Sequence, residues 1–200
     1  SDLVTVKTGL TVDLTESTVD QGIHRRARGT VFIGRVSYTH GMNDDRFRFA
    51  RFMGEVQQYV PLPMFPDSRR LALRARIEKV ESLFDGERIP FYDLPGLGGQ
   101  ESLRGFTFDR FVNDGILLLN AEYRYPIWSY LDGLVFVDAG QAFNGFGDMA
   151  LDRFRWSYGG GVHLLSRRKL GARFEVAHSS EGFTLVLTVT PTFGPRLDDN

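Results

Sequence analysis

The 200-residue sequence contains no cysteine. Disulfides, thiolate metal sites and a cysteine nucleophile are therefore excluded, whereas the absence is compatible with any cellular compartment. No apolar run approaches the roughly 20 residues of a membrane-spanning helix. The first residues, Ser1-Asp2-Leu3, lack the basic and apolar regions of a secretory signal peptide, so an exported form would be a processed chain or a fragment.

An excess of charge of one sign is also missing. The 24 Lys and Arg residues nearly balance the 25 Asp and Glu residues, for a net charge of −1, which predicts no nucleic acid partner. No nucleophile-elbow motif surrounds Ser157 or Ser179. The spacing of His24, His40 and His163 matches no metal-ligand motif. The sequence therefore predicts no enzyme, no metal and no other cofactor.

What the sequence does contain is a regular alternation of apolar and polar residues, the pattern of β-strands with two different faces. We count about nine such segments of roughly 10–13 residues, joined into a single domain over residues 1–200. The polar stretch Thr15–Arg28 is predicted to be a connection, and Pro126–Tyr130 is predicted to be a tight turn. Gly159-Gly160-Gly161 lies inside a segment, where glycine marks a bend, a bulge or a close approach of another group.

Long, regular strands favour an antiparallel barrel, but the alternation does not say which face meets water. A soluble barrel places its apolar face inside, and a membrane barrel places it outside. The strand length matches a tilted crossing of the hydrocarbon core, and the apolar face ends in aromatic residues, as interfacial girdles do. We therefore predict an all-β, antiparallel transmembrane β-barrel whose charged face lines the lumen and includes Lys7, Arg51, Glu55, Arg74, Arg76, Glu78, Arg155, Arg173 and Glu175.

The stretch Leu83–Asp114 interrupts this alternation with about thirty residues rich in Gly and Pro. Loops longer than roughly 12–15 residues are uncommon in compact domains and usually carry function. Its aromatic and leucine residues argue against a solvated linker. We predict that it folds into the lumen. Together with the loop Phe143–Asp152 it belongs to the outer side of the membrane, because outer-membrane barrels have longer loops there and short periplasmic turns.

Two motifs then resemble a known family. The loop reads LGGQESLRGF, ending in Leu103-Arg104-Gly105-Phe106, and two strands later comes Phe136-Val137-Asp138-Ala139-Gly140. The strand between them carries Glu122-Tyr123-Arg124, and the last strand ends in Phe193. This combination is similar to the outer-membrane protein assembly and bacterial surface-antigen superfamily, which includes barrel-assembly insertases and two-partner secretion transporters. The resemblance covers roughly residues 10–193, the C-terminal portion of the family's barrel.

The resemblance implies a contact that we name the loop lock: Arg104 bound to Asp138, with Glu122 nearby. The alternation independently places Glu122, Arg124, Phe136, Asp138 and Gly140 on the lumenal side. An arginine on an entering loop can form bidentate, charge-assisted hydrogen bonds there. Gly105 allows a sharp turn, and Phe106 can pack on the wall. The resemblance also implies that Phe193 is the terminal-strand signal. The alternative is a surface loop in which Arg104 is solvated and makes no lock.

Barrels of this superfamily usually have about sixteen strands, which at about 11 residues each would use most of 200 residues. The chain is therefore a fragment, half of a homodimeric barrel or a small closed barrel. The resemblance implies insertion or translocation of polypeptides in the outer membrane, with lipid and other polypeptides as partners. The alternative is a self-associating anchor or pore domain of a larger protein such as a patatin-like lipase.

Overall fold

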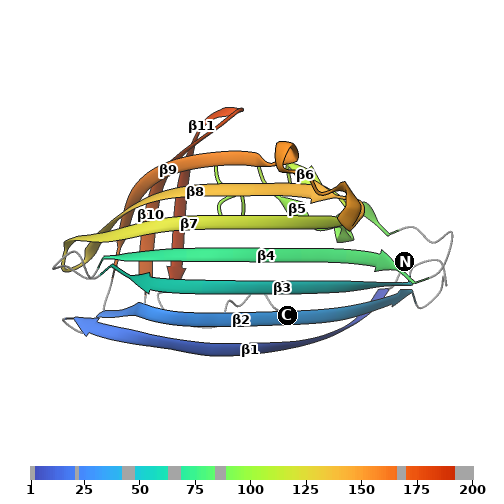
Figure 1. Ribbon diagram of the computed structural model, residues 1–200, viewed down its shortest axis with the longest axis horizontal. Helices are drawn as coiled ribbons and strands as arrows, with labels where there is room; N and C mark the ends of the chain where they lie inside the picture. The colour runs from blue at the N-terminus through green and yellow to red at the C-terminus, as the bar shows by residue number, and fades with distance from the viewer. Residues whose placement is uncertain are drawn as a thin grey trace.

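The computed structural model describes residues 3–20, 23–41, 48–62, 69–83, 89–165 and 170–191. Nine strands of this part form one sheet in the order β1-β2-β3-β4-β7-β8-β9-β10-β11, as Figure 1 shows. Their bounds are β1 Leu3–Asp20, β2 Ile23–Gly41, β3 Arg48–Pro61, β4 Arg70–Ser82, β7 Gly115–Trp128, β8 Leu131–Phe143, β9 Arg155–Leu164, β10 Leu170–Ser179 and β11 Gly182–Pro191.

All neighbouring strands of the sheet pair antiparallel. The sheet curls, so that β10 and β11 run behind β7, β4 and β3 in the view of Figure 1. The predicted all-β, antiparallel barrel wall is therefore confirmed. Among the described residues β1 and β11 each pair with a single neighbour, and the wall stays open between them.

The stretch Thr15–Arg28 is not the connection that the sequence predicted. β1 continues to Asp20 and β2 begins at Ile23, and the two remain paired through a bulge after Glu16. An ion pair of 2.9 Å joins Glu16 Oε2 to Arg28 Nε across the hairpin. The alternation fades here because most residues of this stretch of the sequence are polar, so the period-two signal that marks a strand is lost.

The turn predicted at Pro126–Tyr130 is shorter than expected. β7 runs through Pro126 to Trp128, and β8 begins at Leu131 after a two-residue turn. Proline has no N–H to donate to the ladder, and a register shift between Pro126 and Trp128 accommodates it. Phe193, the predicted terminal signal, lies outside the described residues.

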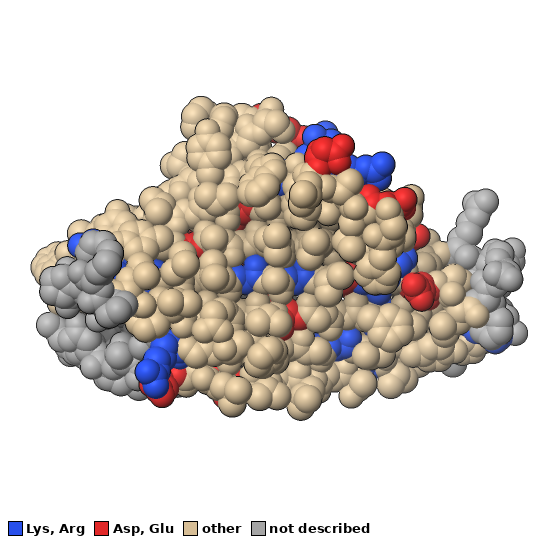
Figure 2. Space-filling model, in the orientation of Figure 1, with Lys and Arg blue, Asp and Glu red and all other residues tan. Residues whose placement is uncertain are grey.

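The apolar face of the sheet points outward. Figure 2 shows this face, on which residues other than Lys, Arg, Asp and Glu predominate. Such a surface suits lipid and would be a liability in water. The assignment of the apolar face to the outside therefore agrees with the sequence prediction. Its exposed side chains include Val6, Leu10 and Leu14 of β1, Phe52 and Val56 of β3, Val135 and Val137 of β8, and Leu185, Leu187 and Val189 of β11.

The long loop lies on the concave side of the sheet, behind β7 and β8 in Figure 1. Its base is a two-stranded ladder of β5 Gly96–Leu97 and β6 Phe111–Val112, preceded by the short 3-10 helix η1, Phe91–Asp93. A buried cluster of Leu97, Leu103, Phe106, Ile116 and Leu118 joins the loop to β7. None of the helices in the described ranges has the length and apolarity that a membrane crossing requires.

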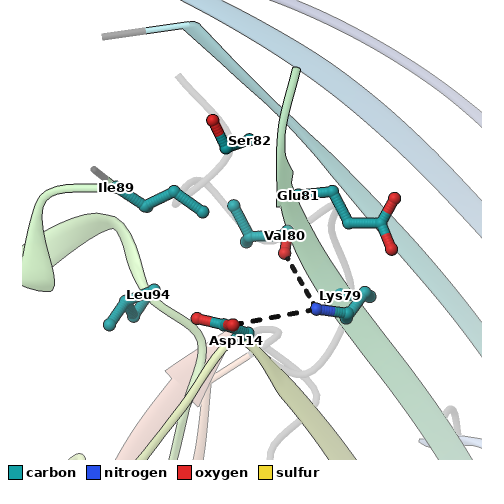
Figure 3. Close-up of a pocket in the computed structure, with 7 residues that line it drawn as sticks. All are labelled: Lys79, Val80, Glu81, Ser82, Ile89, Leu94 and Asp114. Atoms are coloured by element: carbon teal, nitrogen blue, oxygen red, sulfur yellow. Dashed lines mark hydrogen bonds and ion pairs between the residues drawn. The ribbon is translucent and has the colours of Figure 1, made fainter. Parts of the chain in front are cut away.

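Lys79 and Asp114 hold the two ends of the loop at the rim of the sheet. Figure 3 shows both residues beside a small pocket between β4 and the loop. Lys79 Nζ lies 3.2 Å from the carbonyl oxygen of Val80 and 4.0 Å from Asp114 Oδ2. The backbone N–H of Val80 donates to the carbonyl of Asp114 at 2.8 Å, which extends the β4–β7 ladder by one bond. These contacts hold the start and the end of the loop together at the rim of the sheet.

Candidate functional site

The tip of the loop, residues 98–110, is closed by its own hydrogen bonds. Ser102 Oγ accepts from the N–H of Gly98 at 2.8 Å and donates to its carbonyl at 2.9 Å. The N–H of Gly99 donates to the carbonyl of Phe106 at 3.0 Å. Gly98, Gly99 and Gly105 all have positive φ, which L-residues with a side chain rarely adopt. The glycines of the motif therefore give the tip a compact shape that presents Arg104 to the wall.

Arg104 grips Asp138 of β8 through two parallel hydrogen bonds. Arg104 Nε donates to Asp138 Oδ2 and Nη2 donates to Oδ1, both at 2.8 Å. The backbone N–H of Arg104 adds a third bond to Oδ2 at 3.2 Å. Asp138 is fully buried, so this bidentate pair is shielded from water. The structure thus brings together the two residues that the sequence motifs paired.

Two further carboxylates face the same guanidinium. Arg104 Nη1 donates to Glu122 Oε2 of β7 at 2.8 Å and to Glu175 Oε1 of β10 at 3.4 Å. The guanidinium also lies over the ring of Phe136, 3.4 Å from its centroid, a cation–π contact. Burial alone would lower the pKa of Arg104, but these three carboxylates outweigh it and raise the pKa above its usual value. Arg104 therefore stays charged.

Two other arginines balance the charge of the acids. Arg173 Nη2 donates to Glu122 Oε2 at 2.9 Å and also contacts Glu175. Arg124 Nε donates to the second oxygen of Glu122. Three cations and three carboxylates thus form one network across β7, β8, β10 and the loop. Buried networks of this kind are stable only when every member is paired.

Gly140 and Gly159 make room for the lock. A side chain at Gly140 would lie 2.9 Å from Leu97 Cδ1, so the last residue of the Phe-x-Asp-x-Gly motif lets the loop base contact β8. A side chain at Gly159 would lie 2.7 Å from Phe136 Cζ. The glycine triplet therefore marks a close approach, since β9 passes through it without a register break. Phe136 lies between Gly159 and Arg104.

The alternation of apolar and polar residues did not predict that Glu175, Ser179 and Asn120 would contact the loop. Ser179 Oγ donates to the carbonyl of Gly105 at 2.7 Å, and Asn120 Nδ2 donates to Asp138 Oδ1 at 2.8 Å. Both lie on lumenal positions of their strands, as Glu175 does, but nothing in the sequence distinguishes them from other polar lumenal residues. In the described residues no group of acidic or histidine side chains is arranged to hold a metal.

Gly105→Ala is expected to destabilise the protein by about 1–2 kcal/mol, because an L-residue is strained in the left-handed region. Its φ is +89°, and an added Cβ would lie 3.3–3.4 Å from the Cβ atoms of Ser179, Ala177 and Ser157. The measurement is the free energy of unfolding in urea. Gly147→Ala is the matched control, because its Cβ would meet nothing within 4 Å. Equal stability of the two variants would contradict the packing of the tip.

Comparison with known families identifies the family to which this chain belongs. The profile described as the Omp85 superfamily domain matches residues 3–177. The chain belongs to the Omp85 superfamily. Family membership places this Omp85 chain in the outer membrane, in agreement with its outward apolar face. No curated protein sequence matches it significantly.

Two solved structures share the fold of this Omp85 chain. BamA from Haemophilus ducreyi, in a form lacking POTRA domains 1–3, superposes with a TM-score of 0.69 at 16% identity, over 92% of this chain and 42% of that one. CdiB from Acinetobacter baumannii superposes with a TM-score of 0.62 at 16% identity, over 94% of this chain and 33% of that one. The chain thus spans less than half the length of either structure.

Proposed function

We propose that this Omp85 chain is the loop-bearing portion of an outer-membrane barrel that inserts or translocates polypeptides. The family match supports the class of function, and the loop lock is the observation that carries the proposal. Arg104, Asp138 and Glu122 commit buried charges to hold a loop within the lumen, where a solvated loop would need none. The proposed activity consists of strand pairing with a polypeptide or passage of that polypeptide through the barrel, and no covalent bond is made or broken.

The loop also holds the terminal hairpin. Gly105 accepts hydrogen bonds from Ser179 Oγ of β10 and, at 3.3 Å, from Thr184 Oγ1 of β11. Thr188 Oγ1 of β11 and Gln100 Oε1 of the loop lie 2.8 Å apart. We propose that the loop fixes β11 while the outer edge of that strand remains a template on which another strand can pair.

We further propose that other strands of the same polypeptide close the barrel. The nine strands of the described sheet alternate in direction, so β1 and β11 point the same way. Two copies about an axis along the membrane normal would place β1 of one beside β11 of the other in parallel, whereas barrel strands are antiparallel. An odd number of added strands restores antiparallel closure. The mass of the full protein in detergent tests this: we expect a monomer, and a shared dimeric barrel would contradict it.

Asp138→Asn tests the function in liposomes that contain the full protein and receive an unfolded barrel substrate. We expect the rate of substrate insertion to fall about tenfold or more, because a hydrogen bond to a charged group contributes about 1.5–3 kcal/mol. Glu181→Gln is the control: it removes the exposed 2.7 Å pair with Arg110 of the same loop and should leave the rate unchanged. A protein that reaches the membrane but neither inserts nor translocates polypeptides would favour the anchoring role instead.

A further inference from the structure

A second charged region lies on the lumenal face of β1–β4, away from the loop lock. There the four strands and η1 enclose a cavity of about 620 Å³, within the range of roughly 300–1,000 Å³ that ligand sites have. Each of the four strands contributes one cation, Lys7, Arg35, Arg51 and Arg76 in order, and the acids are Glu78 and Asp93. We call this the cationic cavity. Its excess of positive charge contrasts with the balanced network around Arg104.

One acid of the cavity serves two cations. Glu78 is buried and binds Arg51 Nη1 through Oε1 at 2.8 Å and Arg76 Nη2 through Oε2 at 2.6 Å. Arg76 Nε is buried with no hydrogen-bond partner in the structure. Lys7 of β1 and Arg35 of β2 are exposed on the lumenal face. An anion in the lumen would therefore meet these two cations on the side of β1 and β2.

The other acid of the cavity is Asp93, whose carboxylate lies beside two of the cations. Asp93 comes from η1 of the long loop, and its carbonyl oxygen accepts a hydrogen bond from Arg51 Nη2. Its carboxylate faces Arg51 and Lys7, yet Oδ2 is buried without a hydrogen-bond partner. Burial raises the pKa of Asp93, and the two cations oppose that rise. The two cations therefore offset only part of the cost of burying the resident carboxylate.

We propose that the cationic cavity binds acidic stretches of the polypeptide that the barrel handles, an inference that rests on the proposed function. Lys7 opposes Ser37, which in turn opposes Arg51, so Arg35 is the diagonal neighbour of both cations. Diagonal neighbours on adjacent strands lie about 7–8 Å apart. Alternate side chains of an extended peptide repeat every 6.6 Å or so, so acidic residues at alternate positions match this spacing.

The probe is a fluorescent, extended eight-residue peptide with glutamate at alternate positions, compared with the same peptide carrying glutamine. Binding is measured on the full protein in detergent. We expect the double variant Lys7→Gln with Arg35→Gln to bind the acidic peptide about fivefold more weakly, as expected for two solvent-accessible ion pairs. Added salt should weaken wild-type binding in the same direction. Arg153→Gln, on the exposed 3-10 helix Leu151–Arg153, is the control and should change nothing.

Two results would overturn the cavity as a polypeptide site. One is equal affinity for the glutamate and glutamine peptides, and the other is binding of inorganic phosphate with no binding of the acidic peptide. The liposome insertion assay separates this inference from the proposed function. Loss of insertion activity with retained preference for the acidic peptide would refute the function alone, and normal insertion without that preference would refute the cavity alone.

Discussion

Arg104→Met is expected to lower the free energy of unfolding by about 3–5 kcal/mol, the cost of removing one partner from a buried ion pair. The variant leaves Asp138 without its bidentate partner and Glu122 without one of its cations, while both remain buried. Methionine keeps the apolar stem of the side chain but supplies no donor. Urea titration of the full protein in detergent measures the loss, and protease sensitivity of the loop reports its release.

Arg110→Met is the matched control on the same loop. Arg110 pairs with Glu181 at 2.7 Å, but both side chains are exposed, and such pairs contribute about 0.2–1 kcal/mol. Arg104→Lys should recover only part of the stability, since an ammonium group has no planar fork for two oxygens. If Arg104→Met and Arg110→Met cost the same, the loop is not held by buried charge.

Val56→Arg is expected to destabilise the protein in membranes by about 2–4 kcal/mol, the cost of an arginine facing lipid near the bilayer midplane. Val56 lies near the middle of β3 and is exposed on its apolar face. The adjacent Gln57 is lumenal and donates from Nε2 to Glu55 Oε1 at 2.5 Å. Gln57→Arg should therefore be tolerated, because the new cation faces a carboxylate.

Unfolding of each variant in lipid vesicles distinguishes these outcomes. A soluble barrel would predict the reverse order, since its apolar face is the packed interior and its polar face meets water. Equal costs for Val56→Arg and Gln57→Arg would indicate that neither face of β3 contacts lipid.

The strands could be predicted where one face is apolar and the other polar. In β7 and β8 the alternation gave both the strands and the facing of Glu122 and Asp138, because lipid and lumen impose opposite requirements on neighbouring residues. The same signal failed at Thr15–Arg28, where most residues are polar and the alternation of apolar and polar residues is lost. Strand length was therefore predictable only within the apolar band.

The partners of Arg104 could be predicted only in part. Asp138 and Glu122 belong to motifs whose spacing accompanies the loop tip, so they were found. Glu175 is 71 residues away from Arg104 and reaches it only because the sheet curls. The contact of Arg51 with the carbonyl of Asp93 is similar, since it depends on where the loop crosses the wall. Neither the curl of the sheet nor the position at which the loop crosses the wall produces a periodic pattern in the sequence.

Cysteine labelling of two adjacent residues of β3 tests the central claim most directly, because the sequence contains no native cysteine. Met53 lines the cationic cavity, and Phe52 is exposed on the opposite face. In membranes, Met53→Cys should react with a water-soluble maleimide and Phe52→Cys should react only with a lipid-soluble one. The opposite pattern would place the apolar face inside and contradict the account of barrel, lumen and loop.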